Sequence, residues 1–153
     1  MEEPVTIPCV HCEALNRIPR VRLADKPVCG RCKQPLFAGK PVELTDRNFA
    51  AIAERGDVPL LIDFWAAWCG PCQQFAPTFT AAARALEPHV RLVKLDTDAN
   101  PAVAGRFHIR SIPTLIFLHQ GREIARQAGA MDARSLERWV SYGLEQIRGT
   151  PAR

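Results

Sequence analysis

The chain has 153 residues, of which 47% are hydrophobic and 24% are charged, and its formal net charge is +4. This length suits one globular domain with a small appendage and excludes two ordinary domains. No apolar run is long enough to span a bilayer, and Met1-Glu2-Glu3-Pro4 is not a basic and then apolar export signal. We therefore expect an unexported, cytoplasmic protein with no membrane partner.

Residues 1–40 are expected to form a separate module. They contain four of the six cysteines and five prolines, and they show no sustained hydrophobic period. This composition indicates a loop-rich segment that is held together by something other than a core. Residues 41–148 alternate strand and helix patterns, which is typical of an α/β domain, and residues 149–153 form a C-terminal tail.

The hydrophobic pattern of the larger domain predicts a strand at 42–44, a helix after 46, a strand at 58–65, a helix at 69–86, a strand at 90–96, a short helix at 100–107, a hairpin of strands at 114–118 and 123–127, and a last helix from 132 that stops at 149–151. Thr45 or Asp46 is expected to cap the first helix, and Asp132 the last. Pro77 should kink the second helix, because it removes one backbone hydrogen bond.

The segment Trp68-Cys69-Gly70-Pro71-Cys72 directly follows the apolar strand pattern that ends at Trp65. Glycine and proline allow a sharp turn into the next helix, so Cys69 is expected at the helix N-terminus. There the helix dipole stabilises a thiolate, the reactive form of cysteine. Cys72 lies within reach as a resolving thiol. The alternative is that this pair is half of a metal site.

The other four cysteines form two Cys-x-x-Cys pairs, Cys9 with Cys12 and Cys29 with Cys32, separated by sixteen residues. This spacing indicates a four-cysteine ribbon that binds one structural Zn²⁺, with Gly30 easing the second turn. Two further redox disulfides are the alternative. A zinc–thiolate centre would lower the net charge from +4 to +2, and Phe37 is the only aromatic residue of the module. We therefore expect no nucleic-acid partner.

From about residue 42 to 148 the chain resembles the thioredoxins, and several separate motifs carry the resemblance: Asp63-Phe64-Trp65-Ala66, Trp68-Cys69-Gly70-Pro71-Cys72, Pro77, Lys94, Ile112-Pro113-Thr114 and Gly129-Ala130. With the N-terminal cysteine pairs, it looks like the zinc-binding thioredoxin-2 class of bacteria. The resemblance implies a thioredoxin fold, in which helices flank a central mixed β-sheet, with a small N-terminal zinc ribbon.

The resemblance makes Cys69 the nucleophile that attacks a substrate disulfide and Cys72 the thiol that resolves the mixed disulfide. Asp63 would lie buried beneath the pair and accept the proton of Cys72, with Lys94 near it. The alternatives are that Asp63 is a strand-end carboxylate that reaches water, which the apolar Phe64 and Trp65 after it disfavour, and that Lys94 is a solvated strand residue.

The resemblance also implies a cis peptide bond between Ile112 and Pro113, against the active-site sulfurs. The backbone of Ile112 would pair with an extended substrate segment, beside a flat apolar rim made by Trp68, Gly70, Pro71, Gly129 and Ala130. At Gln73 the chain departs from the family, which usually has a basic residue after the second cysteine.

These features predict a monomeric protein-disulfide reductase that acts on cytosolic proteins and is recharged by an NADPH-dependent thioredoxin reductase. An alternative is a zinc-controlled regulatory or chaperone-like protein, in which oxidation of the N-terminal cysteines releases the metal. A third possibility is a zinc-ribbon binding module for which the larger domain is only a scaffold.

Overall fold

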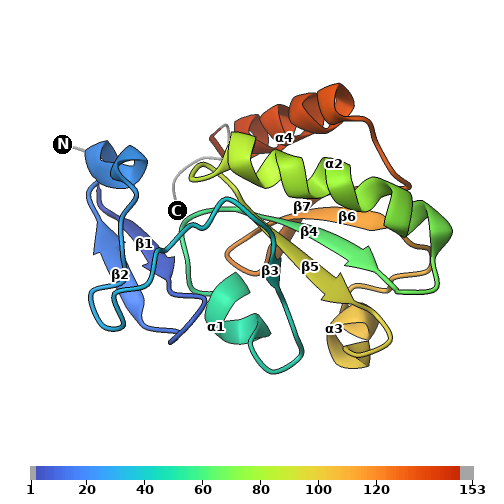
Figure 1. Cartoon of the computed structure of the whole chain (residues 1–153), viewed down its shortest axis with the longest axis horizontal. Helices are drawn as coiled ribbons and strands as arrows, with labels where there is room; N and C mark the ends of the chain where they lie inside the picture. Colours follow the sequence, from blue (N-terminus) through green and yellow to red (C-terminus); the bar gives the residue numbers. More distant parts are fainter. Residues whose placement is uncertain (1–2, 149–153) are drawn as a thin grey trace.

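Five strands form the main sheet of the computed structural model, which describes residues 3–148 (Figure 1). Their spatial order is β3 (Val42–Glu43), β5 (Arg91–Asp96), β4 (Leu60–Trp65), β6 (Thr114–His119) and β7 (Arg122–Ala128). The first three run parallel, whereas β6 and β7 are antiparallel to their neighbours. This mixed sheet confirms the predicted fold class. The predicted tail and the end of the last helix lie outside the described residues.

Helices cover both faces of the sheet (Figure 1). One face packs against α2 (Gly70–Leu86) and α4 (Ala133–Arg148), and the other against α1 (Phe49–Ala53) and α3 (Pro101–Arg106). Along β4, Leu61 contributes to the α2 and α4 face, whereas Leu60 and Ile62 contribute to the other. Because strand side chains alternate between faces, Asp63 belongs to the face that α2 covers. No helix within residues 3–148 has the length and apolar composition that a membrane span requires.

The first helix begins at Phe49, with Asn48 directly before it. Thr45 caps the turn that leads into this helix: its hydroxyl accepts a hydrogen bond from the backbone N–H of Asn48 at 3.1 Å, and the Asn48 side chain accepts one from the backbone N–H of Thr45 at 2.7 Å. The alternative cap, Asp46, is wrong. Asp46 instead accepts hydrogen bonds from the backbone N–H groups of Ala102 (3.1 Å) and Val103 (2.8 Å). Its carboxylate therefore satisfies the free N–H groups in the first turn of α3, which is far away in the sequence.

The N-terminal module contains more regular structure and more core than the sequence predicted. Strands β1 (Val5–Pro8) and β2 (Leu15–Ile18) form an antiparallel hairpin, followed by the 3₁₀ helix η1 (Arg20–Asp25). A small apolar cluster is buried behind the hairpin, and its members are Val5, Ile7, Cys9, Cys29, Leu36 and Val58. Val58 was predicted inside the central strand, but that strand begins at Leu60. The expectation of a coreless module is therefore wrong.

The module packs against the end of the sheet where β4 and β5 begin, at the left of Figure 1. Asp57, just before β4, makes two hydrogen bonds of 2.8 Å with Thr6 of β1: its backbone N–H donates to the Thr6 carbonyl, and its carboxylate accepts from the Thr6 backbone N–H. Arg91, the first residue of β5, is only 2% exposed. Its guanidinium donates to the carbonyls of Pro8 (2.9 Å) and Leu36 (2.7 Å) and lies 4.8 Å from the centre of the Phe37 ring.

Replacing Arg91 by Met should lower the free energy of unfolding by about 3 kcal/mol, because it leaves two buried carbonyls without donors. Burial lowers the pKa of Arg91 to about 10, so the side chain is still a cation at neutral pH. Urea unfolding of the zinc-loaded protein would measure the loss. Arg122→Met changes an exposed residue that also begins a strand, and it serves as the control. Equal stability of the two variants would contradict the bridging role of Arg91.

Candidate redox and zinc sites

The two redox cysteines lie where β4 ends and α2 begins. Cys69 is the N-cap residue of α2, and its sulfur accepts a hydrogen bond from the backbone N–H of Cys72 at 3.2 Å. A disulfide joins Cys69 and Cys72, and the two residues are only 4% and 3% exposed. The predicted placement at the helix N-terminus is therefore confirmed. N–H donors aimed at a sulfur favour its thiolate once the disulfide is reduced.

A second segment meets the disulfide from the loop before β6. The peptide bond between Ile112 and Pro113 is cis, as predicted. The sulfur of Cys69 lies 3.8 Å from the carbonyl oxygen of Ile112. The backbone N–H of Gly129 donates to the carbonyl of Pro113 at 2.8 Å, which brings the end of β7 to the same place. Cys69, the Ile112-Pro113 segment and Gly129, which the resemblance assigned to one site, thus lie close together.

The rim residues around the disulfide are mostly open to solvent. Trp68 is 72% exposed, and Gly70, Pro71 and Ala130 are also exposed. The indole N–H of Trp68 donates to a carboxylate oxygen of Asp98 at 2.8 Å. Sequence reasoning missed Asp98. Its position two residues after β5 could have revealed it. The carboxyl ends of parallel strands meet at one edge of a sheet, so residues that follow β5 lie near Trp68, which follows β4.

Asp63 is buried on the face of the sheet that α2 covers, with 1% of its surface exposed. Burial raises its pKa to about 7, and the charge of Lys94 opposes this rise without cancelling it. One carboxylate oxygen, Oδ1, has no hydrogen-bond partner among the described residues. A carboxyl with these properties can take up and release a proton near neutral pH.

Lys94 lies beside Asp63 in the register of the parallel pair β4 and β5. The part of the chain that the structure describes shows no ion pair between the two side chains. The ammonium of Lys94 instead lies 4.5 Å from the centre of the Trp65 ring. Lys94 therefore acts on the Asp63 carboxylate through its electric field and not as a direct partner.

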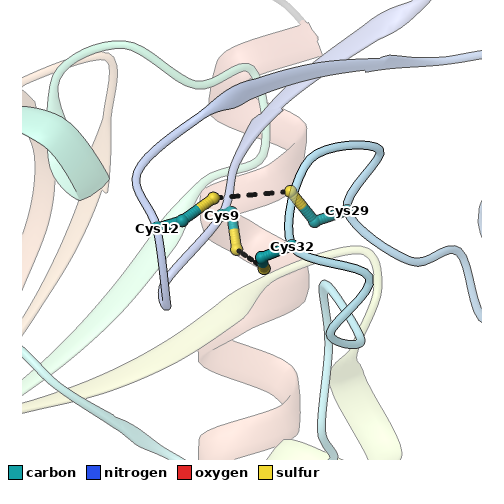
Figure 2. Close-up of side chains that lie close together, drawn as sticks. All are labelled: Cys9, Cys12, Cys29 and Cys32. Carbon is teal, nitrogen blue, oxygen red and sulfur yellow. Dashed lines mark hydrogen bonds between the residues drawn. The ribbon is translucent and has the colours of Figure 1, made fainter.

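The four N-terminal cysteines come together in one cluster (Figure 2). Their sulfurs all lie within 4.8 Å of one another, and two pairs across the cluster, Cys9 with Cys32 and Cys12 with Cys29, are 3.6 Å apart. Four thiolates around a tetrahedral Zn²⁺, each about 2.3 Å from the metal, would be about 3.8 Å apart. The cluster therefore fits a closed tetrahedral zinc site.

The two cysteine turns have the same backbone conformation. In each, the first cysteine's carbonyl accepts a bond from the residue four positions later, Glu13 or Lys33, at 2.9 Å. Both of these residues have φ of 67°. Gly30 was expected to ease the second turn. The residue of that turn with a left-handed backbone conformation is instead Lys33. Identical turns place both cysteine pairs to bind one metal ion.

Backbone and side-chain donors surround Cys29. The backbone N–H of Cys32, then the Asn16 amide and the backbone N–H of Arg31, lower the pKa of Cys29 to about 6. Asn16 also accepts a bond from the backbone N–H of Gly30 at 2.9 Å, so it links β2 to the second turn. Asn16 is a supporting residue that the sequence did not reveal. Such donors favour the thiolate that metal binding requires.

Comparison with known proteins gives matches in both parts of the chain. A family model described as Thioredoxin matches residues 40–142, and one described as Thioredoxin 2, N-terminal, matches residues 8–34. Thioredoxin C-3 of Corynebacterium nephridii is 43% identical over 143 residues, which cover 94% of this chain and 98% of the relative.

Other relatives match a shorter stretch of the chain. Thioredoxin of Haemophilus influenzae is 36% identical over 65% of this chain and 94% of its own length. The bifunctional thioredoxin reductase/thioredoxin of Mycobacterium leprae is 39% identical over 68% of this chain and 23% of its own length. The chain therefore belongs to the thioredoxin family of protein-disulfide reductases, in the class that carries a zinc-ribbon module at the N-terminus.

Proposed function

We propose that this protein reduces disulfides of cytosolic proteins through a cycle of Cys69 and Cys72. The Cys69 thiolate attacks one sulfur of the substrate disulfide and forms a mixed disulfide, while the other substrate sulfur leaves as a thiolate. Cys72 then attacks Cys69, which releases the second substrate thiolate and forms the Cys69–Cys72 disulfide. The substrate gains two electrons, and the protein loses two. The observation that carries this proposal is the disulfide at the N-terminus of α2, beside the Ile112 carbonyl.

The resolving step needs a base, because Cys72 must lose its proton before it can attack. Asp63 is our candidate: it lies on the sheet face beneath α2, and burial raises its pKa to about 7. Lys94 favours the ionised form of Asp63 and so limits that rise. In the oxidised protein, the proton then leaves from Asp63 to solvent.

Substrates would bind along the edge of the disulfide. Ile112 is partly exposed and its carbonyl lies next to the Cys69 sulfur, where an extended segment could add backbone hydrogen bonds. Trp68, Gly70, Pro71, Gly129 and Ala130 form the apolar rim, and Pro113 lies buried beneath it. This surface makes little demand on the substrate's sequence.

Reduction of the Cys69–Cys72 disulfide requires a second partner. We infer an NADPH-dependent thioredoxin reductase, and the bifunctional relative, whose name joins both activities in one chain, supports this inference. We place the protein in the cytoplasm, because a dithiol and four zinc-binding thiols suit a reducing compartment. We expect it to act as a monomer. One Zn²⁺ held by Cys9, Cys12, Cys29 and Cys32 would stabilise the fold of the module and take no part in electron transfer.

The cycle can be tested by removing the resolving thiol. A Cys72→Ser variant should retain Cys69 as a nucleophile and accumulate stable mixed disulfides with cell proteins, which mass spectrometry can identify at Cys69. A Cys69→Ser, Cys72→Ser double variant is the control. If the single variant traps no more protein than the double variant, the proposed reductase cycle is wrong.

A further inference from the structure

Gln73, the first residue after the redox pair, is hydrogen-bonded to the loop before that pair, although its side chain lies on the surface. Its side chain is exposed, yet the amide Nε2 donates to the carbonyl of Ala67 at 2.6 Å. Its backbone N–H donates to the carbonyl of Cys69 at 3.1 Å. Gln73 therefore binds the chain on both sides of Trp68 and closes the loop from Ala67 to Cys69 against the first turn of α2.

That loop has few other anchors. On the side of β5, Asp98 holds the Trp68 indole at 2.8 Å. On the side of α2, no other donor among residues 3–148 reaches the Ala67 carbonyl, and the Ala67 side chain is too small to pack the loop in place. Gln73 thus holds the backbone just before Trp68, and Asp98 holds the Trp68 indole.

We propose that Gln73 is a positioning residue that holds Trp68 in the orientation needed to bind protein disulfides. The proposal rests on the reductase function proposed above and deepens it. The residue acts through the loop and not on the sulfurs, because its side chain is uncharged and is bonded to Ala67. A protein substrate must cover the rim, so it depends on Trp68. A small disulfide can reach Cys69 without covering the rim.

The test separates the hydrogen bond from the charge that family members usually carry here. Gln73→Met keeps the length of the side chain but removes the donor, and Gln73→Lys restores a donor and adds a charge. Gln74→Met is the matched control, because Gln74 is the next residue of α2, is exposed, and its side chain makes no hydrogen bond within residues 3–148. The probes are insulin, a protein disulfide, and oxidised glutathione, a small one.

We expect Gln73→Met to lower kcat/KM for insulin about fivefold, the loss that one hydrogen bond accounts for, mainly through a higher KM. The rate with oxidised glutathione and the reduction potential should not change. Gln73→Lys should keep most of the wild-type activity with insulin, and Gln74→Met all of it. Because both glutamines are exposed, equal thermal midpoints would show that the variants are folded.

Two results would overturn the proposal: equal insulin kinetics in Gln73→Met and Gln74→Met, or an equal loss with insulin and with oxidised glutathione. A loss in Gln73→Lys as large as in Gln73→Met would do the same, because the donor would then not matter. Failure of the reductase function has a different signature, since the wild-type protein itself would then reduce no insulin.

Discussion

Asp63→Asn should make the oxidised protein more stable than the wild type at pH 8, by about 4 kcal/mol. Burial raises the pKa of Asp63 from 3.8 to about 7, so the folded protein holds this proton more tightly than the unfolded chain does. The wild type therefore loses stability as the pH rises from about 4 to about 7. Asn has no charge to desolvate, so the variant avoids this loss.

The stability difference should shrink to about 1 kcal/mol at pH 4.5, because this pH lies only slightly above the unfolded pKa of 3.8, and it should vanish only well below that pKa. Urea unfolding of the oxidised, zinc-loaded proteins at pH 4.5 and pH 8 would measure it. Asp25→Asn changes an exposed carboxylate on the N-terminal module and should have little effect at either pH. A stability difference that is the same at both pH values would show that the Asp63 charge is not the cause.

The same variant should turn over more slowly, because Asn cannot accept the proton of Cys72. General acid–base catalysis is worth on the order of 100-fold at its lower end, and we expect a loss up to that size in the resolving step. Single-turnover kinetics would measure that step directly. A more stable but slower protein would show that the buried carboxylate is retained for catalysis at the expense of stability.

Loss of zinc should unfold the N-terminal module while the larger domain stays folded. In small zinc domains the metal contributes on the order of 10 kcal/mol, and the buried cluster around Ile7 and Leu36 is too small to replace it. We expect Cys29→Ser to lower the zinc content from about one ion per chain to almost none. Proteases should then cut within residues 3–40.

His11→Ala is the matched control for zinc loss, because His11 is exposed and lies between two of the ligand cysteines. It should retain the metal and resist the protease. Metal analysis and limited proteolysis of both variants would measure the effect. The larger domain should persist, since the match to the Haemophilus relative spans only 100 residues of this chain yet covers 94% of that relative. A protease-resistant, zinc-free Cys29→Ser module would show that the apolar cluster is sufficient.

Much of the redox site could be predicted because its signals are local. The apolar run before Trp68 predicted β4, and the Cys69-Gly70-Pro71-Cys72 turn predicted the start of α2 within one residue. The spacing of the four N-terminal cysteines predicted a cluster that the structure brings together. In each case, residues close in sequence determine the geometry.

The features that the sequence did not reveal depend on contacts between distant segments. Asp46 looked like the cap of the next helix, but it caps α3, more than fifty residues away. Arg91 is buried at the start of β5, and the carbonyls to which it donates come from the first forty residues. The apolar cluster of the module is completed by Val58, which lies outside it. A hydrophobic period describes only neighbouring residues, so it cannot predict contacts between distant segments.

The zinc ribbon and the redox disulfide lie at opposite ends of β4, whose six residues span about 20 Å. Thiol–disulfide exchange requires direct contact between sulfur atoms. The sheet therefore separates the two sets of cysteines: within one folded molecule, neither Cys69 nor Cys72 can reach a ribbon sulfur. Scrambled disulfides between the two sets can arise only between molecules or in unfolded chains. The fold itself thus protects a protein that must carry both metal-binding thiols and a reactive dithiol.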